Sequence, residues 1–403
     1  SPITSINTAY HPDGSTVQSR TTSTYPEGTT TVLHESYHPD GVPKFESTEV
    51  DGKLHGIWTS WHPNGNLSGR FSYLHGQYDG PWEQFDTSGR PTRMQIYALG
   101  IVIQRINTAY FPSSLRSSEI IRDYLDGNQT TVSRTWHSTG ALAKYSRSIN
   151  GHLAGLAKEF DWLGRPTRET TYLAGVPHGS VRTWYPDSTK LLSEGSYSNN
   201  KQDGLWNWYH PNGQLERSEE YASGIPNGNF AHFNENGVQL YAQTWVNGKL
   251  RQNEQWYLYE NGTLRIHNVS TSNGGDLNRG DIADTVLFER WDEEGREAAY
   301  QENVAGRRHG SFRDYFMGIL LADSNYRQGL LDGRSQRFYY GENSPDNGNL
   351  VSDSYHREGR LNGESLTYDP STGILLERAQ YLRGKLHGLR EQFFQSDGSP
   401  SYT

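Results

Sequence analysis

The residues of this chain that could most readily do chemistry are its 15 histidines, because imidazole binds metal ions and moves protons near neutral pH. They recur at two main kinds of position. Five stand at the head of a short turn sequence, namely His11, His38, His62, His137 and His210. Four precede the glycine that ends a connector, namely His55, His178, His309 and His387. Equivalent positions of a repeat form a row and do not converge on one point, so we interpret most of these histidines as structural.

Other catalytic patterns are missing from the sequence. It contains no Gly-x-Ser-x-Gly elbow, no His-Glu-x-x-His and no phosphate-binding glycine loop followed by Lys-Ser/Thr. It has no cysteine, which excludes a disulfide framework and a thiolate metal site. The carboxylates are scattered, and no pair stands out for acid–base work. We therefore expect a protein that is not an enzyme and that holds no cofactor.

Two weaker signals involve polar side chains. Four residues in and just after the glycine-rich segment 271–281 could offer oxygen ligands to Ca²⁺, namely Asp276, Asn278, Asp281 and Asp284. Their spacing fails the EF-hand template, so we expect no metal site. Asn-x-Ser/Thr sequences compatible with glycosylation occur at Asn66, Asn128, Asn261 and Asn268. A chain this rich in Asn, Ser and Thr contains about that many by chance.

Aromatic residues make up 12% of the chain and fall into two columns. Counted from the glycine that opens a strand, the second position holds Trp58, Trp82, Trp206, Phe230 and Phe312. The fifth position holds Trp61, Phe85, Tyr209 and Phe233. Strand side chains alternate between faces, so the columns should lie on opposite faces of a sheet. We expect these aromatic ladders to stack in place of a conventional core, with cross-strand pairs each worth up to ~1 kcal/mol. The alternative is that one ladder is partly open and binds sugar rings or a partner.

The elements that position these residues follow from a repeat of 24 residues, seen best between Gly204 and Gly228. Each copy has a short aromatic strand, a four-residue turn such as His-Pro-Asn-Gly, a second strand and a glycine-containing connector. Proline presets the turn, and glycine takes the left-handed position that lets the chain pair again. Twelve turn glycines mark clear copies: Gly14, Gly41, Gly65, Gly89, Gly140, Gly164, Gly213, Gly237, Gly262, Gly295, Gly373 and Gly398.

Four degenerate copies raise the number of expected hairpins to about sixteen. The sequence therefore predicts an all-β protein, an elongated and twisted antiparallel sheet or solenoid of tandem hairpins. We expect one continuous array over residues 1–403, with four-hairpin blocks at 1–100 and 101–200. INTAYHP at 6–12 recurs as INTAYFP at 106–112, which marks these blocks as duplicates. Further hairpins follow at 201–270 and 282–403, on either side of an irregular, projecting loop at 271–281.

The connectors carry a family resemblance. Asp-Gly-Lys-Leu-His-Gly at 51–56 and the similar segments at 223–228, 305–310 and 383–388 are each followed by a strand with aromatic residues. This pattern resembles the MORN-type repeat variant of bacterial YwqK-family antitoxin proteins, which implies side-by-side hairpins and a scaffold role. Phe-Asp-x-x-Gly-Arg-Pro-Thr-Arg at 85–93 and 160–168 is similar, more weakly, to the YD repeats of Rhs shells.

Composition limits the expected partners and the expected cellular location of the protein. The net charge of −9 is spread thinly, so we expect no nucleic-acid partner, and no apolar run is long enough to span a membrane. The bias toward Tyr, Thr, Ser, Asn and Gly fits a secreted or surface protein, with the cytoplasm as the alternative; the chain begins Ser-Pro, so we expect a removed leader or tag. We expect a structural scaffold whose partners are other copies of itself, joined end to end in a filament, or a protein along the sheet. A cytoplasmic antitoxin or immunity protein and a glycan-binding module are the alternatives.

Overall fold

The computed structural model describes residues 3–25, 28–279, 283–341, 344–393 and 399–402. Compact packing divides the chain into two units, Ser1–Lys201 (unit 1) and Gln202–Thr403 (unit 2). This boundary coincides with the end of the second duplicated block. That the whole chain forms one continuous array stays a prediction, and each unit is described here by itself.

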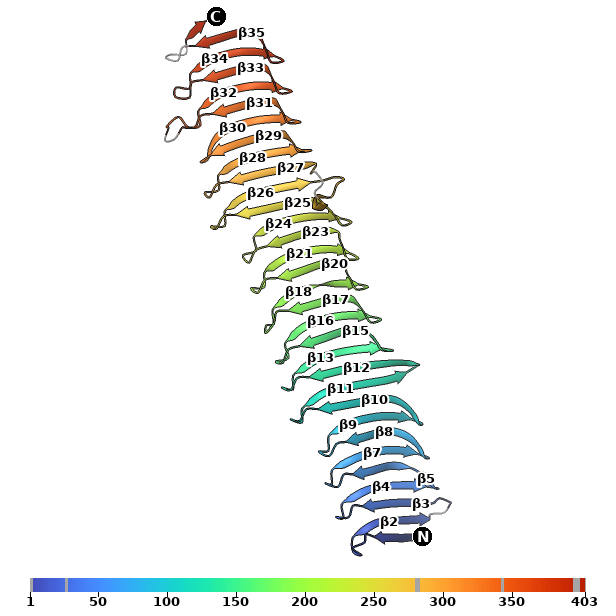
Figure 1. Ribbon diagram of the computed structural model, residues 1–403. Helices are drawn as coiled ribbons and strands as arrows, with labels where there is room; N and C mark the ends of the chain where they lie inside the picture. The colour runs from blue at the N-terminus through green and yellow to red at the C-terminus, as the bar shows by residue number, and fades with distance from the viewer. Residues whose placement is uncertain (1–2, 26–27, 280–282, 342–343, 394–398, 403) are drawn as a thin grey trace. The chain divides into compact units, whose positions relative to one another are not determined.

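Unit 1 is built from antiparallel strands that follow one another in chain order (Figure 1). Its strands are β1 (Ile3–Tyr10), β2 (Val17–Tyr25), β3 (Thr31–Tyr37), β4 (Pro43–Val50), β5 (Lys53–Leu54), β6 (Gly56–Trp61), β7 (Leu67–Leu74), β8 (Gln77–Phe85), β9 (Pro91–Ala98), β10 (Ile101–Tyr110), β11 (Arg116–Leu125), β12 (Asn128–Trp136), β13 (Leu142–Ile149), β14 (His152–Leu153), β15 (Gly155–Phe160), β16 (Pro166–Leu173), β17 (Val176–Trp184) and β18 (Leu191–Ser198). The short β19 (Lys201–Gln202) lies at the unit boundary.

Unit 2 repeats this arrangement. Its elements are β20 (Gly204–Tyr209), β21 (Leu215–Ala222), β22 (Ile225–Pro226), β23 (Gly228–Phe233), β24 (Gln239–Val246), β25 (Lys249–Leu258), β26 (Leu264–Thr271), η1 (Leu277–Arg279), β27 (Thr285–Trp291), β28 (Glu297–Val304), β29 (Arg307–Phe316), β30 (Ile319–Arg327), β31 (Leu330–Phe338), β32 (Leu350–Arg357), β33 (Arg360–Tyr368), β34 (Leu375–Leu382), β35 (Lys385–Phe393) and β36 (Pro400–Tyr402). The all-β prediction and its hairpin repeat are confirmed.

Two kinds of turn alternate, one at each edge of the sheet in each unit. At the long-turn edge lie the turns of the His-Pro-Asn-Gly type, where Gly65 and Gly213 have φ of 83° and 93°. The other predicted turn glycines are also left-handed, except Gly398, which lies outside the described residues. At the short-turn edge the chain reverses through two residues. Both of these residues have positive φ, as in Asp51 (50°) and Gly52 (73°), which suits the twist of a tight hairpin.

Glycines past the short turns interrupt strands. His55 separates β5 from β6 and Asn227 separates β22 from β23. The glycines that open the second strand of each pair, Gly56 and Gly228, have φ values of 86° and 130°, which fit a bulge. Each short segment β5, β14, β19 and β22 continues in this way into the next strand. Counted so, the 36 segments of the described residues make 32 strands, the number that sixteen hairpins supply.

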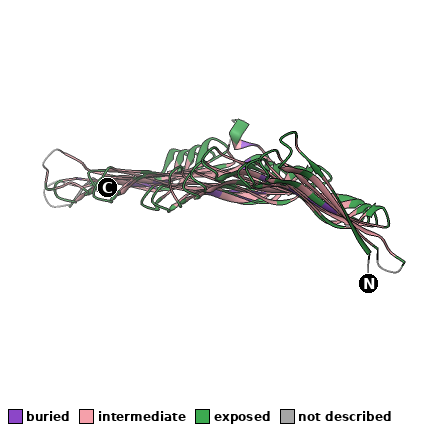
Figure 2. Ribbon diagram, turned by 90° about the horizontal axis from the view of Figure 1, so that it is seen from below, coloured by how far each residue is buried: buried purple, intermediate pink, exposed green. Residues whose placement is uncertain are grey.

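Burial is shallow throughout the described residues, because the strands of each unit form a single layer (Figure 2). The buried hydrophobic side chains are Val181, Trp206, Phe230, Leu250 and Ala379, which lie within strands or at their starts. In the described part of the chain the one helical element is the three-residue η1, and none is long and apolar enough to cross a membrane.

The described part of the irregular loop of unit 2 is joined to the sheet by hydrogen bonds. Asp276 is 7% exposed, and its Oδ1 accepts a hydrogen bond from the Leu250 N–H at 3.0 Å. Arg251 donates to the carbonyl of Gly275. The backbone groups at the start of β25 therefore find partners in the loop, which explains why this segment folds back.

Candidate binding groove

A row of side-chain contacts joins successive turns along the long-turn edge. At five turn heads the histidine Nε2 lies within hydrogen-bond distance of the backbone carbonyl of the aromatic residue that precedes the next long turn. A carbonyl oxygen can only accept, so Nε2 carries the proton. The pairs are His11–Tyr37 (3.2 Å), His38–Trp61 (3.3 Å), His62–Phe85 (3.1 Å), His137–Phe160 (3.0 Å) and His210–Phe233 (3.0 Å). These histidines therefore link repeats, as their spacing predicted.

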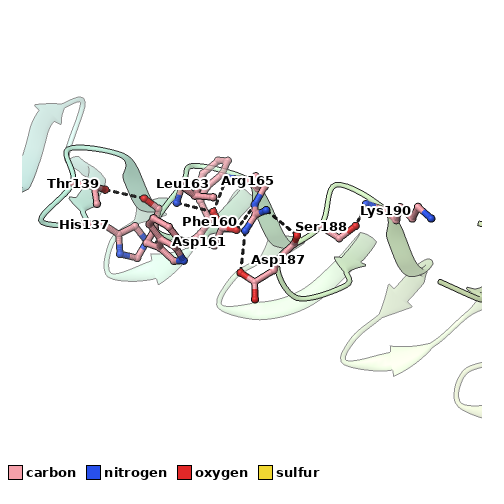
Figure 3. A network of polar contacts seen from close by, with 10 residues as sticks. His137, Thr139, Phe160, Asp161, Leu163, Arg165, Asp187, Ser188 and Lys190 are labelled. Atoms are coloured by element: carbon pink, nitrogen blue, oxygen red, sulfur yellow. Dashed lines mark hydrogen bonds and ion pairs between the residues drawn. The ribbon is translucent and has the colours of Figure 1, made fainter. Parts of the chain in front are cut away.

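At the turn headed by Asp161, an arginine four residues later makes the link. Asp161 accepts from Arg165 Nε, and Arg165 extends to the next turn, donating to the carbonyl and carboxylate of Asp187 at 2.8 and 3.0 Å (Figure 3). Asp86 with Arg90 and Asp292 with Arg296 form the same ion pair. The paired guanidinium holds the pKa of Asp86 below its usual value through its hydrogen bonds. A turn-head histidine, or the Asp161–Arg165 pair, thus fills the space between two turns.

The third turn residue adds a parallel contact. Asn64 and Asn212 each donate from the side-chain amide to a carbonyl of the next turn, at 2.6 and 2.7 Å, and Thr139 donates to Trp162 in the same way. Asn66 and Asn261, two of the glycosylation candidates, also donate to the next turn. A glycan on either amide would compete with these contacts.

The aromatic ladder predicted for unit 1 is stacked. Phe45, Trp58, Phe71 and Trp82 follow one another with ring centroids 6.0, 4.9 and 4.9 Å apart. A second stack joins Tyr73, Tyr78 and Tyr97 at 4.7 and 4.9 Å. The rings take the place of a second layer. Phe71, Tyr73 and Tyr97 belong to strands that the glycine-based count did not use, and Tyr78 precedes the glycine from which its strand was counted.

In unit 2 two of the three second-position aromatics, Trp206 and Phe230, are buried. Trp206 is 5% and Phe230 is 7% exposed, and Phe230 lies between Tyr221 and Trp245 at 5.3 and 5.7 Å. Phe312 meets Tyr326 edge to face at 6.0 Å. The stacking interpretation fits these rings better than an open, ligand-binding ladder.

A charged cluster lies beside this ladder, around the buried carboxylate of Glu219. Tyr221 donates to it at 2.7 Å, Arg217 lies at 3.2 Å and His232 Nε2 at 3.5 Å. Burial acts to raise the pKa of Glu219, but the contacts with His232, Tyr221 and Arg217 outweigh it and hold the pKa below its usual value. Arg217 in turn stacks on Trp208, 3.9 Å from the ring centre. Sequence reasoning missed this cluster, because its members come from three strands.

The cluster leads to a groove through Tyr241, whose ring stacks on His232 with centroids 4.0 Å apart. Burial, and then the charge of Glu219, raise the pKa of Tyr241 to about 12. The groove has a volume of about 530 Å³ and opens between the turns at 234–237 and 259–262. Its lining consists of Asn234, Asn236, Leu240, Tyr241, Gln255, Trp256, Tyr257, Leu258, Tyr259, Glu260 and Gly262. We call it the Asn234 groove.

The row of turn contacts changes at this groove. Asn234 heads its turn where other turns have histidine, and its Oδ1 accepts from the N–H groups of Asn236 and Val238 in the same turn. Val238 stands where Arg90 and Arg165 stand in their turns. No hydrogen bond joins Asn234 or the Asn236 side chain to the next turn within the described residues. The row resumes at Tyr259, which donates to the Trp291 carbonyl at 3.0 Å.

A histidine beside the groove has two carboxylate neighbours. His267 Nδ1 lies 2.8 Å from Glu289, and its Nε2 lies 2.8 Å from Glu254. Trp256 stacks on the same ring with centroids 5.2 Å apart and planes at 11°. Trp256 is therefore held in place from the side of β26.

The structure does not gather the weak Ca²⁺ candidates into a site. Asp276 is occupied by backbone N–H groups of Leu250 and Asn278, and Asp284 accepts from Asn273. Asp281 lies outside the described residues. Of the other glycosylation candidates, Asn128 accepts from Asn150, and Asn268 has a buried side-chain oxygen.

Exposed aliphatic side chains gather at the short-turn edge of unit 1, and we call this row the aliphatic edge. Its members are Leu99 (68% exposed), Ile101 (70%), Leu125 (67%), Ile149 (37%), Leu173 (56%) and Val176 (43%). All flank or occupy two-residue turns. Leu99 and Ala174 have φ of 47° and 49°, a conformation that nonpolar residues seldom adopt, so sequence reasoning did not place turns there. The glycine that follows each of them, Gly100 and Gly175, was the sequence signal that could have revealed these turns.

The chain is a β-hairpin repeat. Its antiparallel hairpins are linked turn to turn and stabilised by stacked aromatic rings. The family model of the MORN repeat variant matches residues 54–75 and 202–222. The resemblance to this repeat variant is confirmed at these two places. No curated protein matches the chain.

Several solved structures are similar in part. A crystal structure of TcdB2-TccC3 has 10% identity and a TM-score of 0.19, over 98% of this chain and 26% of that one. A structure of TcdB2-TccC3-TEV has 11% identity and a TM-score of 0.19, over 93% and 24%. The Tc holotoxin pore of Photorhabdus luminescens has 12% identity and a TM-score of 0.17, over 97% and 24%. The chain thus spans about a quarter of each of these chains.

Proposed function

We propose that this chain is a non-enzymatic scaffold that works through protein contacts, including contacts with other copies of itself. The observation that carries the proposal is the aliphatic edge of unit 1. Apolar side chains that remain in water in a regular row can mark a surface for a partner. Here the repeat places one or two of them at each short turn, so a partner would meet a regular row. The histidines and aspartates of the long turns support the same role, because they link repeats to one another.

The test is a pair of charged substitutions in that row, Leu125→Lys with Leu173→Lys. Both side chains are exposed, so the melting temperature should stay within error of the wild type. We expect sedimentation velocity to show concentration-dependent association of the wild type and a marked loss of it in the double variant. A wild type that stays monomeric up to its solubility limit, or a double variant that associates equally well, contradicts self-contact through this edge.

A filament is the more specific form of this proposal, and it rests on β1 and β10. Both strands contain the sequence INTAY, at 6–10 and 106–110. β10 pairs with β9 on one side and β11 on the other, whereas β1 pairs with β2 alone among the described strands. Ile6 is 65% exposed, and its counterpart Ile106 is partly covered. Of the shared residues in β10, Ile106 and Asn107 pair with Met94 and Arg93 of β9. A β9-type strand of a second copy could pair with Ile6 and Asn7 in the same way.

Ile6→Lys tests the filament, because a lysine on an edge strand opposes the addition of another strand. We expect filaments of the wild type in negative-stain electron microscopy and none in this variant. The Leu125→Lys, Leu173→Lys protein is the matched control and should still form filaments if strand addition alone makes them. Filaments of Ile6→Lys would show that β1 is not the joint. A secreted or surface location belongs to the same proposal and rests on composition.

A further inference from the structure

We propose that the Asn234 groove binds one neutral sugar ring of a glycan. The proposal is independent of the protein-contact function, because the groove lies at the long-turn edge of unit 2. It also differs from the stacked aromatic ladders, whose rings are covered by one another. Three observations carry it: the interrupted row of turn contacts, the chemistry of the lining and the fixed position of its rings.

The first observation explains why the groove exists. In five other turns a histidine extends across to the next turn, and in a sixth Asp161 does so through Arg165. Asn234 is shorter than histidine, and its oxygen is already used by two N–H groups of its own turn. Val238 has no group that could extend across. The space that a bridging side chain occupies elsewhere is therefore left to the groove, whose volume of about 530 Å³ is typical of small-ligand sites.

The second observation identifies the ligand class. The described lining combines four aromatic residues with the amides of Asn234, Asn236 and Gln255, and with one carboxylate, Glu260. None of the lining residues carries a positive charge, which disfavours phosphates, sulfates and acidic sugars. Aromatic surfaces accept the apolar C–H face of a sugar ring, and amides donate to and accept from its hydroxyl groups. A neutral sugar satisfies both kinds of group at once.

The strand pairing argues against an extended peptide as the occupant. Peptides that bind sheets commonly add a strand to a free edge. The strands at this groove have no such edge, since β24 pairs with β23 and β25, and β25 pairs with β24 and β26. A ligand there must be bound by side chains, and those present suit a sugar.

The third observation is that the rings are already fixed. Tyr241 stacks on His232, Trp256 stacks on His267, and Tyr259 donates to the Trp291 carbonyl. Tyr257 donates to Gln255 Oε1 at 3.1 Å, which orients that amide. Side chains that are held before binding lose little conformational entropy when the ligand arrives. Tyr257 is also 48% exposed, so its ring is available to a ligand.

The test uses neutral trisaccharides of glucose, galactose and N-acetylglucosamine, titrated into the whole chain by isothermal calorimetry. We expect at least one to bind, and Asn234→His to weaken it by about tenfold or more, because histidine fills the groove and restores the bridge. Phe111→His is the matched control: it places the same histidine at an equivalent turn head outside the lining, so affinity should change by less than about threefold. Both variants should melt no lower than about the wild-type temperature.

Three results would overturn the proposal. The first is that no neutral trisaccharide binds at millimolar concentration. The second is that Asn234→His binds sugar as tightly as the wild type. The third is that sialylated or sulfated sugars, or uncharged peptides, bind at this groove while neutral sugars do not. Loss of binding in Tyr257→Ala, with an unchanged melting temperature, would support the proposal through a second lining residue on another strand.

Discussion

His62 shows what a single side chain contributes in this repeat. Its ring joins two turns through the Phe85 carbonyl at 3.1 Å, at a partly buried position. A net hydrogen bond of this kind stabilises a fold by about 1 kcal/mol. We expect His62→Ala to lower the free energy of unfolding by about that amount, measured in urea. His75→Ala, at a short-turn position, is the comparison; an equal loss in both would mean that the link to Phe85 contributes nothing of its own.

Glu219 is the residue from which a pH dependence follows. Its pKa is held below the usual value in the folded protein, so folding favours the charged form. Its stabilising contribution is complete above the usual glutamate pKa and disappears as the pH falls through the lower, folded value. We expect the unfolding free energy of the wild type to fall more steeply below about pH 4.5 than that of Glu219→Gln. Parallel curves for the two proteins in acid would contradict this.

The long turn is the element whose geometry was easiest to predict. Gly65 has a φ of 83°, and no atom lies within 4 Å of the position that a Cβ would take. The cost of a substitution there is therefore backbone strain alone. We expect Gly65→Val to lose about 1–2 kcal/mol of stability and Gly65→Asn much less, because asparagine tolerates the left-handed region. Urea denaturation of both variants tests this, and equal stabilities would refute the strain argument.

The bulge glycine Gly228 behaves differently, because space as well as φ limits it. A Cβ on Gly228 would collide with the side chain of Glu220. Gly228→Ala should therefore cost more than Gly65→Ala, although both glycines have positive φ. Hydrogen exchange should place the damage in β21–β23. An equal cost for the two alanine variants would show that Glu220 moves aside freely.

Hairpins could be predicted from sequence because each is specified locally, by Pro-Asn-Gly turns and by Thr- and Tyr-rich strands. The strand from Gly204 to Tyr209 and the strand from Gly228 to Phe233 have the predicted bounds. The turn-head histidines were predicted as structural, but their carbonyl partners depend on the register between hairpins. The Asn234 groove depends on a missing bridge between turns about 25 residues apart, so no local pattern reveals it.

At the scale of the whole molecule, nearest-neighbour energetics make a simple prediction. Each strand contacts mainly the strands before and after it, so stability is approximately a sum over neighbours. We expect Ser1–Lys201 and Gln202–Thr403, expressed separately, each to give a cooperative melt and β-type circular dichroism. A half that is unfolded at all temperatures would show that its stability needs the other.

Antiparallel pairing has a mechanical consequence for each unit. The hydrogen bonds between strands run perpendicular to the strands, along the direction in which the hairpins succeed one another. Tension applied along that direction loads the bonds of the outermost strand one after another, as in a zipper. Each hairpin that peels away also breaks its long-turn contact and releases 24 residues, or roughly 80 Å of chain. A unit under tension would therefore lengthen in many small, reversible steps and would act as an elastic element that absorbs mechanical load.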